Sequence, residues 1–194
     1  MPINTTFTEM QNLPALPGLI HVPGRWYTNT IANANTVATM TANVLFATPI
    51  LVPVTRVYSL IGINVTTASA TRNIRLGLYA DKSVSTGSTD GGYPDALVLD
   101  AGVVSAATIL ARWLPLNKLL KSGWYWMAAV LDGGTPAVNH MTAAGCLPFM
   151  GFSSLTDVTF HVGWSKSFTY AALPDPFGGG AVTTVNVPAV RLYI

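Results

Sequence analysis

Histidine and cysteine are the side chains of this sequence with the strongest metal-binding and nucleophilic chemistry. His21, His140 and His161 fall in a proline-containing stretch, an irregular stretch and a predicted strand, so their spacing predicts no shared site. His140 and Cys146 lie close in sequence, but zinc requires further ligands, and the sequence has one cysteine. We therefore interpret the histidines as separate hydrogen-bonded imidazoles and Cys146 as a small buried residue.

Acidic side chains are few and scattered. The chain has eight Asp and Glu residues, which form no evident buried pair of the kind that glycoside hydrolysis requires. Asp81, Asp90 and Asp95 flank the loop at residues 82–95, and Ca²⁺ prefers several such oxygens. Because the loop lacks EF-hand spacing, we predict a solvated loop and leave open whether it binds a cation.

Motifs of common enzyme families are absent from the sequence. It contains no Gly-rich phosphate loop, no Walker lysine, no nucleophile elbow and no HExxH. We therefore predict no catalytic residue, no cofactor and no metal. A hydrolase built on a β-sandwich is the enzymatic alternative to this non-enzymatic reading.

Aromatic side chains offer the clearest binding chemistry. An aromatic ring face suits the apolar side of a sugar ring, although aromatic residues in β-sandwiches more often lie in the core. The candidates for stacking on a ligand are Trp113, Tyr125 and Trp164. They make a carbohydrate-binding module the alternative to a purely structural protein.

Alternating residues predict β-strands from about Thr36 onward. Over residues 56–66, apolar and β-branched side chains recur at every second position, which is typical of a half-buried strand. The residues expected to share one face are Val57, Ser59, Ile61, Ile63 and Val65. Another strand is expected up to Leu116, followed by a polar turn that ends at Gly123.

Residues 124–131 are apolar on both faces, which predicts a central strand. We expect the second sheet to cover one face, and an N-terminal arm or a neighbouring subunit to cover the other. With eight to ten short predicted strands and no convincing helix, the fold class is all-β: a single jelly-roll-like antiparallel β-sandwich.

The N-terminal stretch predicts an extended arm over residues 1–34, followed by a sandwich domain over residues 35–194. Its prolines remove backbone donors and fix φ, which disfavours both helix and central strand. Its apolar side chains should lie on the chain's own sandwich or on a neighbour. The candidate assembly residues are Leu13, Leu16, Leu19, Ile20 and Trp26.

The composition limits the classes of partner. The longest apolar run, Val44 to Val54, contains two prolines and is too short for a spanning helix, so we expect no membrane insertion. The net charge is +2 and no basic cluster exceeds Arg72–Arg75, so we expect no nucleic-acid partner.

The scarcity of charge favours assembly. Charged residues make up 9 % of the chain, against about 25 % in an average soluble domain. Hydrophobic residues make up 50 %. Because large exposed apolar patches mark interfaces, we expect an obligate oligomer or part of a larger assembly.

Three stretches together resemble a module that recurs in virion proteins of tailed bacteriophages. They are ANVLFATPILVPVTRVYSLIGINVTT, then RLGLYADKS with GGYPDALVLDAGVVS, then LKSGWYWMAAVLD, and the likeness covers roughly residues 26–131. The resemblance implies a non-enzymatic structural or attachment module, often trimeric, and carries over no catalytic residue.

The resemblance and the composition together predict a bacteriophage virion structural protein, made in the host cytoplasm and located in the virion. It would be an outward-facing capsid decoration (cement) subunit or a compact fibre subunit. The expected partners are its own copies, as a homotrimer, and capsid or tail components. The alternative is a carbohydrate- or receptor-binding module that attaches to glycans of the host surface.

Overall fold

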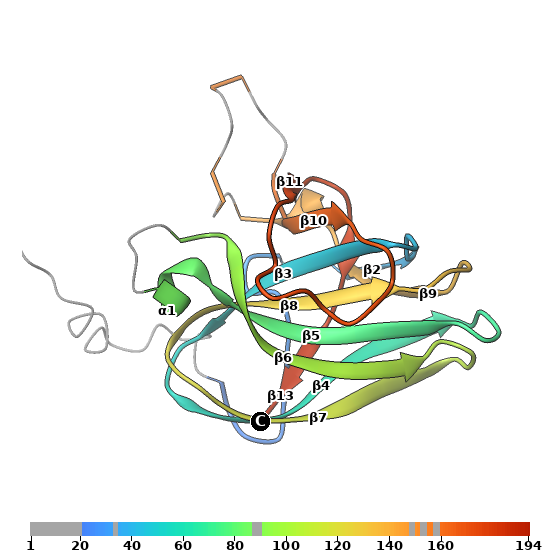
Figure 1. Ribbon diagram of the computed structural model, residues 1–194, viewed down its shortest axis with the longest axis horizontal. Helices are drawn as coiled ribbons and strands as arrows, with labels where there is room; N and C mark the ends of the chain where they lie inside the picture. Colours follow the sequence, from blue (N-terminus) through green and yellow to red (C-terminus); the bar gives the residue numbers. More distant parts are fainter. Residues whose placement is uncertain (1–20, 33–34, 87–90, 148–149, 152–154, 157–159) are drawn as a thin grey trace, which may run out of the picture.

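The computed structural model describes residues 21–32, 35–86, 91–147, 150–151, 155–156 and 160–194. Within these residues the chain forms two antiparallel β-sheets packed face to face (Figure 1), which confirms the predicted all-β sandwich. The described helices are short: α1 (Lys82–Thr86) and the 3-10 turn η2 (Ala143–Gly145). No helix in this part of the chain is long and apolar enough for a membrane span.

The two sheets have seven and six strands. Sheet 1 contains β1 (Trp26–Tyr27), β2 (Asn35–Thr39), β4 (Arg56–Thr67), β7 (Leu110–Leu120), β9 (Ala137–Met141), β12 (Val187–Pro188) and β13 (Arg191–Tyr193). Sheet 2 contains β3 (Val44–Val52), β5 (Asn73–Asp81), β6 (Pro94–Ser105), β8 (Gly123–Leu131), β10 (Gly163–Ser167) and β11 (Ala181–Thr183).

Eight of these strands have jelly-roll topology. Their order is β2-β9-β4-β7 in sheet 1 and β3-β8-β5-β6 in sheet 2. From β2 to β9 the chain changes sheet at every connection except the β5–β6 hairpin. This alternation makes each sheet from strands that are distant in sequence.

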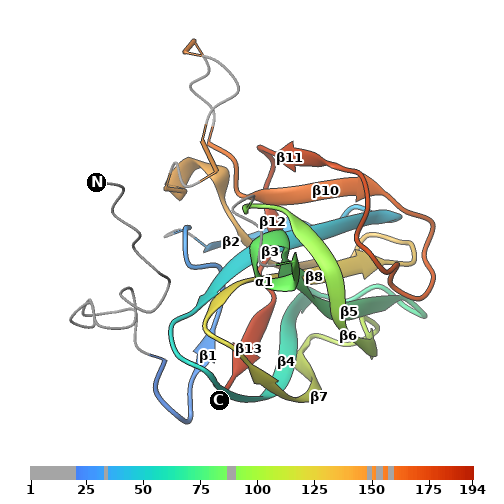
Figure 2. The same ribbon diagram turned by 60° about the vertical axis from the view of Figure 1, so that its left-hand side comes forward.

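The remaining strands extend both sheets. Strand β10 pairs with β3 and carries β11 on its far side. In sheet 1, β4 pairs with β9 only near Val65 and Thr67, whereas β13 pairs with β4 at residues 60–62 and β12 pairs with β9. The segment 187–193 therefore fills the space where β4 and β9 diverge, and β1 lies beside β13 (Figure 2).

The inward face of β4 changes parity, which the alternation in sequence does not predict. Ile61, Ile63 and Val65 are buried as expected, but Val57 is exposed and Tyr58 is fully buried. The register of β4 against β7 shifts between Tyr58 and Leu60. An irregularity of this kind re-aims side chains, so residues on its two sides reach the same core.

Strand β7 is longer than predicted. It continues to Leu120 in place of the polar turn expected after Leu116. Pro115 lies within it, and β7 pairs only with β4, so this proline stands on an edge strand where its missing N–H is tolerated.

Strand β8 is buried on both faces, as predicted. Tyr125, Met127 and Leu131 face the core between the sheets, whereas Trp126, Ala128 and Val130 face outward into a second cluster. That second cluster is closed by Leu173 and Phe177. The expected cover by the arm or by a neighbour is therefore wrong, because residues 168–180 of the same chain cover this face; we call them the clasp (Figure 1).

The clasp is held on sheet 2 by polar bonds as well as by packing. The backbone N–H of Leu173 donates to the Asp100 carboxylate at 3.0 Å. The backbone N–H of Leu97 donates to the Asp175 carboxylate, also at 3.0 Å. Both acidic side chains thus tie the clasp to β6.

The described part of the predicted arm lies on its own sandwich. Strand β1 pairs with β13, and Ile31 is buried in the main core. Asn29 donates from its side-chain amide to the carbonyl oxygen of Val162 at 3.1 Å. Residues 22–32 are thus bonded to the sheets, while residues 1–20 lie outside the described residues.

Candidate functional site

Aromatic side chains gather on the outer surface of strands β1, β13, β4 and β7. Ile61 and Leu192 are fully buried, so the residues next to them along β4 and β13 point away from the core. The strand register then aligns one row across the sheet and a second row beside it. The first row is Trp26, Tyr193, Leu60 and Pro115, and the second is Arg191, Gly62 and Trp113.

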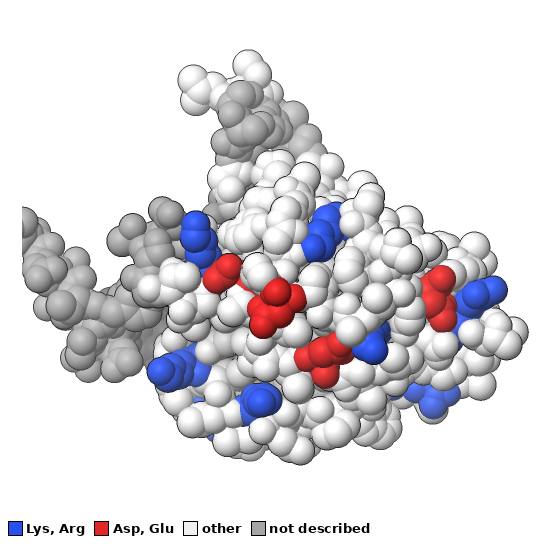
Figure 3. Space-filling view, viewed as in Figure 1, with Lys and Arg blue, Asp and Glu red and all other residues white. Residues whose placement is uncertain are grey.

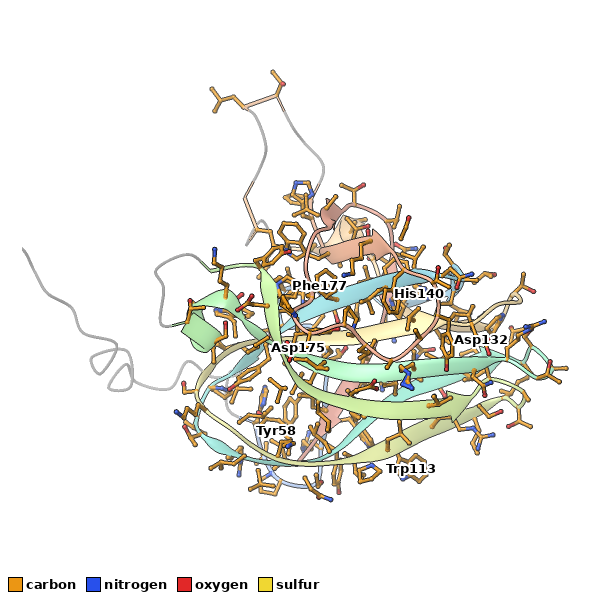
Figure 4. The ribbon with its side chains drawn as sticks, in the orientation of Figure 1. Tyr58, Trp113, Asp132, His140, Asp175 and Phe177 are labelled. Atoms are coloured by element: carbon orange, nitrogen blue, oxygen red, sulfur yellow. The ribbon has the colours of Figure 1, made fainter. Side chains whose placement is uncertain are left out.

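We call Trp26, Leu60, Trp113, Pro115 and Tyr193 the aromatic face. Trp113 is 55 % exposed and Trp26 is 39 % exposed. Figure 4 shows Trp113 outside the sandwich, along β7, whereas Tyr58 lies within it. The cross-strand pair Val57 and Leu119, also exposed, continues the apolar surface along β4 and β7.

Gly62 forms the floor of the aromatic face. A Cβ atom at this position would lie 2.7 Å from the carbonyl oxygen of Arg112 and 3.2 Å from the Trp26 ring atom Cη2. The indole of Trp26 therefore extends from β1 over β13 and rests on the bare backbone of β4. Its ring centre lies 5.1 Å from that of Tyr193.

The described acidic residues are confined to one sheet, whereas cations occur in both: sheet 2 contains Arg75 and also Lys166, whose ammonium bonds to the carbonyl oxygens of Phe177 and Gly178. Within the described strands of sheet 1 the charged residues are all cationic: Arg56, Arg112, Lys118 and Arg191. The acidic residues that the structure describes all lie in sheet 2 or in segments bonded to it: Asp81, Asp95, Asp100, Asp132 and Asp175. Figure 3 shows acidic side chains on the side of the molecule that carries the clasp.

The aromatic face has cations at its rim. Arg191 stands across Gly62 from Trp113, and Arg25 directly precedes Trp26 and is exposed. The aromatic face can therefore contact a flat apolar partner surface, and acidic groups on that partner would find guanidinium partners at its edge.

A second candidate site is a pocket of about 420 Å³ on sheet 2. Its lining consists of Asp81, Ser83, Gly91, Gly92, Trp124, Met150, Trp164 and Val182. Trp164 donates from its indole nitrogen to the carbonyl oxygen of Gly92 at 2.8 Å, and its ring meets that of Tyr93 edge to face. The pocket thus has two indoles and a thioether in its wall, which suits a ring-shaped ligand.

Asp81, at the base of this pocket, is fully buried and accepts bonds from five donors. They are the backbone N–H groups of Ser83, Gly92 and Tyr93, the Ser83 hydroxyl and the Trp126 indole N–H, at distances of 2.6 to 3.0 Å. These bonds use the lone pairs of the carboxylate, so Asp81 closes the loop at residues 82–93 and leaves little capacity for a cation.

Of the two other acidic residues that flank this loop, the structure describes Asp95 alone. Asp90 lies outside the described residues, and Asp95 accepts a bond from the Ser85 hydroxyl. Among the residues that the structure describes, no three His, Cys, Asp or Glu side chains come close enough to hold a metal ion.

Cys146 is buried in the main core, as predicted. Its thiol donates to the carbonyl oxygen of His161 at 3.2 Å, and burial raises the pKa of Cys146 to about 11. It is therefore a thiol, and a weak nucleophile, at neutral pH.

The two other histidines are buried and separately bonded. His140 bonds to the Val138 carbonyl oxygen at 3.0 Å, and burial lowers its pKa. His21 stacks on Tyr27 with 3.8 Å between ring centres and bonds to the Tyr58 hydroxyl at 2.6 Å. Burial, and then the Arg56 charge, lower the pKa of His21 to about 4.

The predicted stacking residues fall in three different places. Trp113 lies on the aromatic face and Trp164 lines the pocket. Tyr125 is only 4 % exposed and belongs to the core between the sheets, so the prediction that it stacks on a ligand is wrong. Along β8 the side chains alternate between the two faces of sheet 2, and Tyr125 lies on the same face as Met127, which points toward sheet 1.

The predicted assembly residues are only partly described. Trp26 lies on the aromatic face. Leu13, Leu16, Leu19 and Ile20 lie outside the described residues. Tyr193 belongs to the aromatic face and Gly62 forms its floor; neither was predicted, because only the pairing of β4 with β13 and β7 places them beside Trp113.

Comparisons with family models, with curated proteins and with solved structures found no match to the chain. The resemblance to phage virion modules therefore stays a prediction from sequence motifs. The geometry of the aromatic face and of the tryptophan pocket is the basis on which a function can be assigned.

Proposed function

We propose that this chain is a non-enzymatic structural subunit of a bacteriophage virion, a capsid decoration or compact fibre subunit, and that the aromatic face is its assembly surface. The observation that carries the proposal is the exposure of Trp26 and Trp113 on the same outer face of sheet 1. Burial of apolar surface contributes about 25 cal/mol per Å², so a partner that covers two indoles is strongly favoured.

The outer face of sheet 2 supports the proposed assembly surface by comparison. The outer face of sheet 2 is also apolar, and there the clasp covers it with Leu173 and Phe177. The aromatic face has no such cover among the described residues. In a chain with 9 % charged residues, an uncovered aromatic face favours association with a partner.

Light scattering coupled to size exclusion tests the assembly surface. The wild-type chain should form a discrete oligomer at micromolar concentration, and Trp113→Asp should shift it toward the monomer. Val37→Asp, at an exposed apolar position on β2, at the opposite edge of sheet 1 from β7, is the matched control and should leave the oligomer intact. A monomeric wild-type chain would count against the proposal.

Location in a particle needs its own experiment. Tailed particles produced from the genome that encodes the chain should contain it by peptide mass spectrometry, and gold-labelled antibody should decorate their heads or tails. Recovery of the chain only from the particle-free fraction would overturn the virion assignment while leaving the assembly surface untouched.

A second candidate function is attachment to host-surface carbohydrate or receptor. The observation that favours it is the tryptophan pocket, whose lining combines the indoles of Trp124 and Trp164 with the polar side chain of Asp81. Screening on a glycan array should give hits that Trp164→Ala removes and Trp113→Ala retains. An array without hits, or equal loss in both variants, would remove this function from the pocket.

A further inference from the structure

We propose that the aromatic face of one copy docks on the clasp of a second copy, in a head-to-tail contact. This inference rests on the proposed assembly function and names the surface that the aromatic face meets. The exposed clasp residues that would receive it are Ala171, Ala172, Asp175, Pro176, Gly178, Gly179 and Gly180.

Charge argues against contact between two aromatic faces. The described strands of sheet 1 contain cationic residues and no Asp or Glu, and Arg25 adds a further exposed cation at the rim. A two-fold contact would bring Arg25 and Arg191 of one copy toward the same residues of the other. Such a contact would place like charges together with no carboxylate from either face to neutralise them.

Charge favours the clasp as the receiving surface. Asp175 is exposed at the centre of the clasp, and Figure 4 places it over sheet 2, on the opposite side of the sandwich from Trp113. A head-to-tail contact therefore brings an acidic side chain to the guanidinium rim of the aromatic face. The pairing of Arg191 with Asp175 is the charge-assisted hydrogen bond that we expect there.

Shape points to the same partner. The exposed part of the clasp consists of alanine, proline and glycine around Asp175, with Thr169 near one end, so its exposed residues all have short side chains. Indoles pack closely on such surfaces, as Trp26 already does on Gly62. The clasp itself is fixed by bonds to β6, so it is a preformed surface for the neighbour.

The contact has a consequence for symmetry. A head-to-tail interface uses two different surfaces of each copy, so every open chain of subunits ends with one unpaired aromatic face and one unpaired clasp. Closure into a ring removes both ends. The aromatic face and the clasp lie on opposite sides of the sandwich, so identical contacts close into the predicted homotrimer only if each copy is strongly rotated relative to the last; without that rotation they give an open stack.

Charge exchange on the full-length chain tests the contact. Arg191→Glu and Asp175→Lys should each raise the Kd for self-association at least about tenfold. The variant that carries both changes should return to within about threefold of wild type, because each contact again pairs opposite charges. Lys82→Glu, on α1 beside sheet 2, is the matched charge control and should leave self-association unchanged.

A second variant keeps the test valid if Asp175→Lys disturbs the clasp. Asp175→Asn retains an oxygen acceptor for the Leu97 N–H and removes only the charge, so it should fold with wild-type thermal stability and still associate more weakly. An oligomer that neither Arg191→Glu nor Asp175→Asn weakens would overturn this inference and leave the proposed assembly function standing. A wild-type chain that stays monomeric at micromolar concentration would overturn both this inference and the proposed assembly function.

Discussion

The outer faces of both sheets carry large apolar side chains, but these are shielded from solvent to different extents on the two faces. Over sheet 2, Leu173 packs on the backbone of Gly77 and is 6 % exposed. Over sheet 1, Trp26 packs on the backbone of Gly62 and is 39 % exposed. Both faces seat a large side chain on a glycine, but only the face of sheet 2 is sealed by the chain itself.

This difference separates stability from recognition. Leu173 and Phe177 of the clasp are buried within one molecule, so loss of either side chain should lower the free energy of unfolding. The aromatic face is half open, so loss of its residues should change association more than folding. Four experiments can break or sharpen this distinction.

The largest effect is expected at Phe177, a clasp residue that is fully buried against sheet 2. Phe177→Ala should lower the free energy of unfolding by about 3–5 kcal/mol, because it removes an aromatic ring from a closed cluster and leaves a cavity. Urea unfolding monitored by circular dichroism measures this change. A loss below about 1 kcal/mol would show that the clasp contributes little to folding.

Low pH should lower the free energy of unfolding through protonation of His21, which lies against β1 and β4 of sheet 1. Its folded-state pKa of about 4 lies below the ordinary value of 6.5, so the unfolded chain binds the proton more readily. The stability present above pH 6.5 should therefore fall as the pH drops from 6.5 toward 4, by up to about 3 kcal/mol.

The groups that face His21 are Tyr27 from β1 and both Tyr58 and Arg56 from β4. Burial raises the pKa of Tyr58, so its hydroxyl stays protonated through this window. Urea unfolding at pH 7 and pH 4.5 should show a smaller pH dependence in His21→Phe than in wild type. Buried His140 contributes to the slope in both proteins, so equal slopes would place the titrating group there instead.

Gly62 and Gly77, on which Trp26 and Leu173 pack, allow a matched pair of substitutions. Gly77→Ala and Gly62→Ala should each destabilise the fold by about 1–3 kcal/mol, because a Cβ at either position meets a backbone carbonyl oxygen at 2.7 to 2.8 Å. The effect should be larger for Gly77→Ala, since Leu173 has no solvent into which it can move. Thermal unfolding ranks the two variants, and a larger effect at Gly62 would reverse the comparison.

The smallest effect on folding is expected at Trp113. Its exposed side chain extends from an edge strand, so Trp113→Ala should change the free energy of unfolding by less than about 1 kcal/mol. The same variant should weaken self-association in sedimentation velocity experiments. A large loss of stability with unchanged association would assign Trp113 to the fold instead of to a partner.

Much of the sandwich follows from alternation along the sequence. The two apolar parities of residues 124–131 predicted a strand covered on both sides, and β8 has that position. The pattern failed at Val57 and Tyr58, where the register shift in β4 reverses which side chain faces the core. A shift of this kind depends on the partner strand, which local periodicity does not contain.

The clasp over sheet 2 and the distribution of charge were harder to predict. Leu173 and Phe177 lie in a segment of alanine, proline and glycine without periodicity, so nothing local indicates that they close a cluster. The separation of charge also requires knowledge of strand order, because Asp100 and Arg112 are near in sequence but belong to opposite sheets. Trp26 and Trp113 were named from the sequence as candidate assembly and stacking residues, whereas Leu60, Pro115 and Tyr193 of the aromatic face were not.

The aromatic face draws its residues from positions 26, 60, 113, 115 and 193, which only the finished pairing of β1, β13, β4 and β7 brings together. A chain that is truncated, or that has not yet inserted residues 187–193 between β4 and β9, lacks the row on which a neighbour would dock. Incorporation into an oligomer would thereby select for subunits that have completed folding, and defective copies would be left out without any separate inspection step.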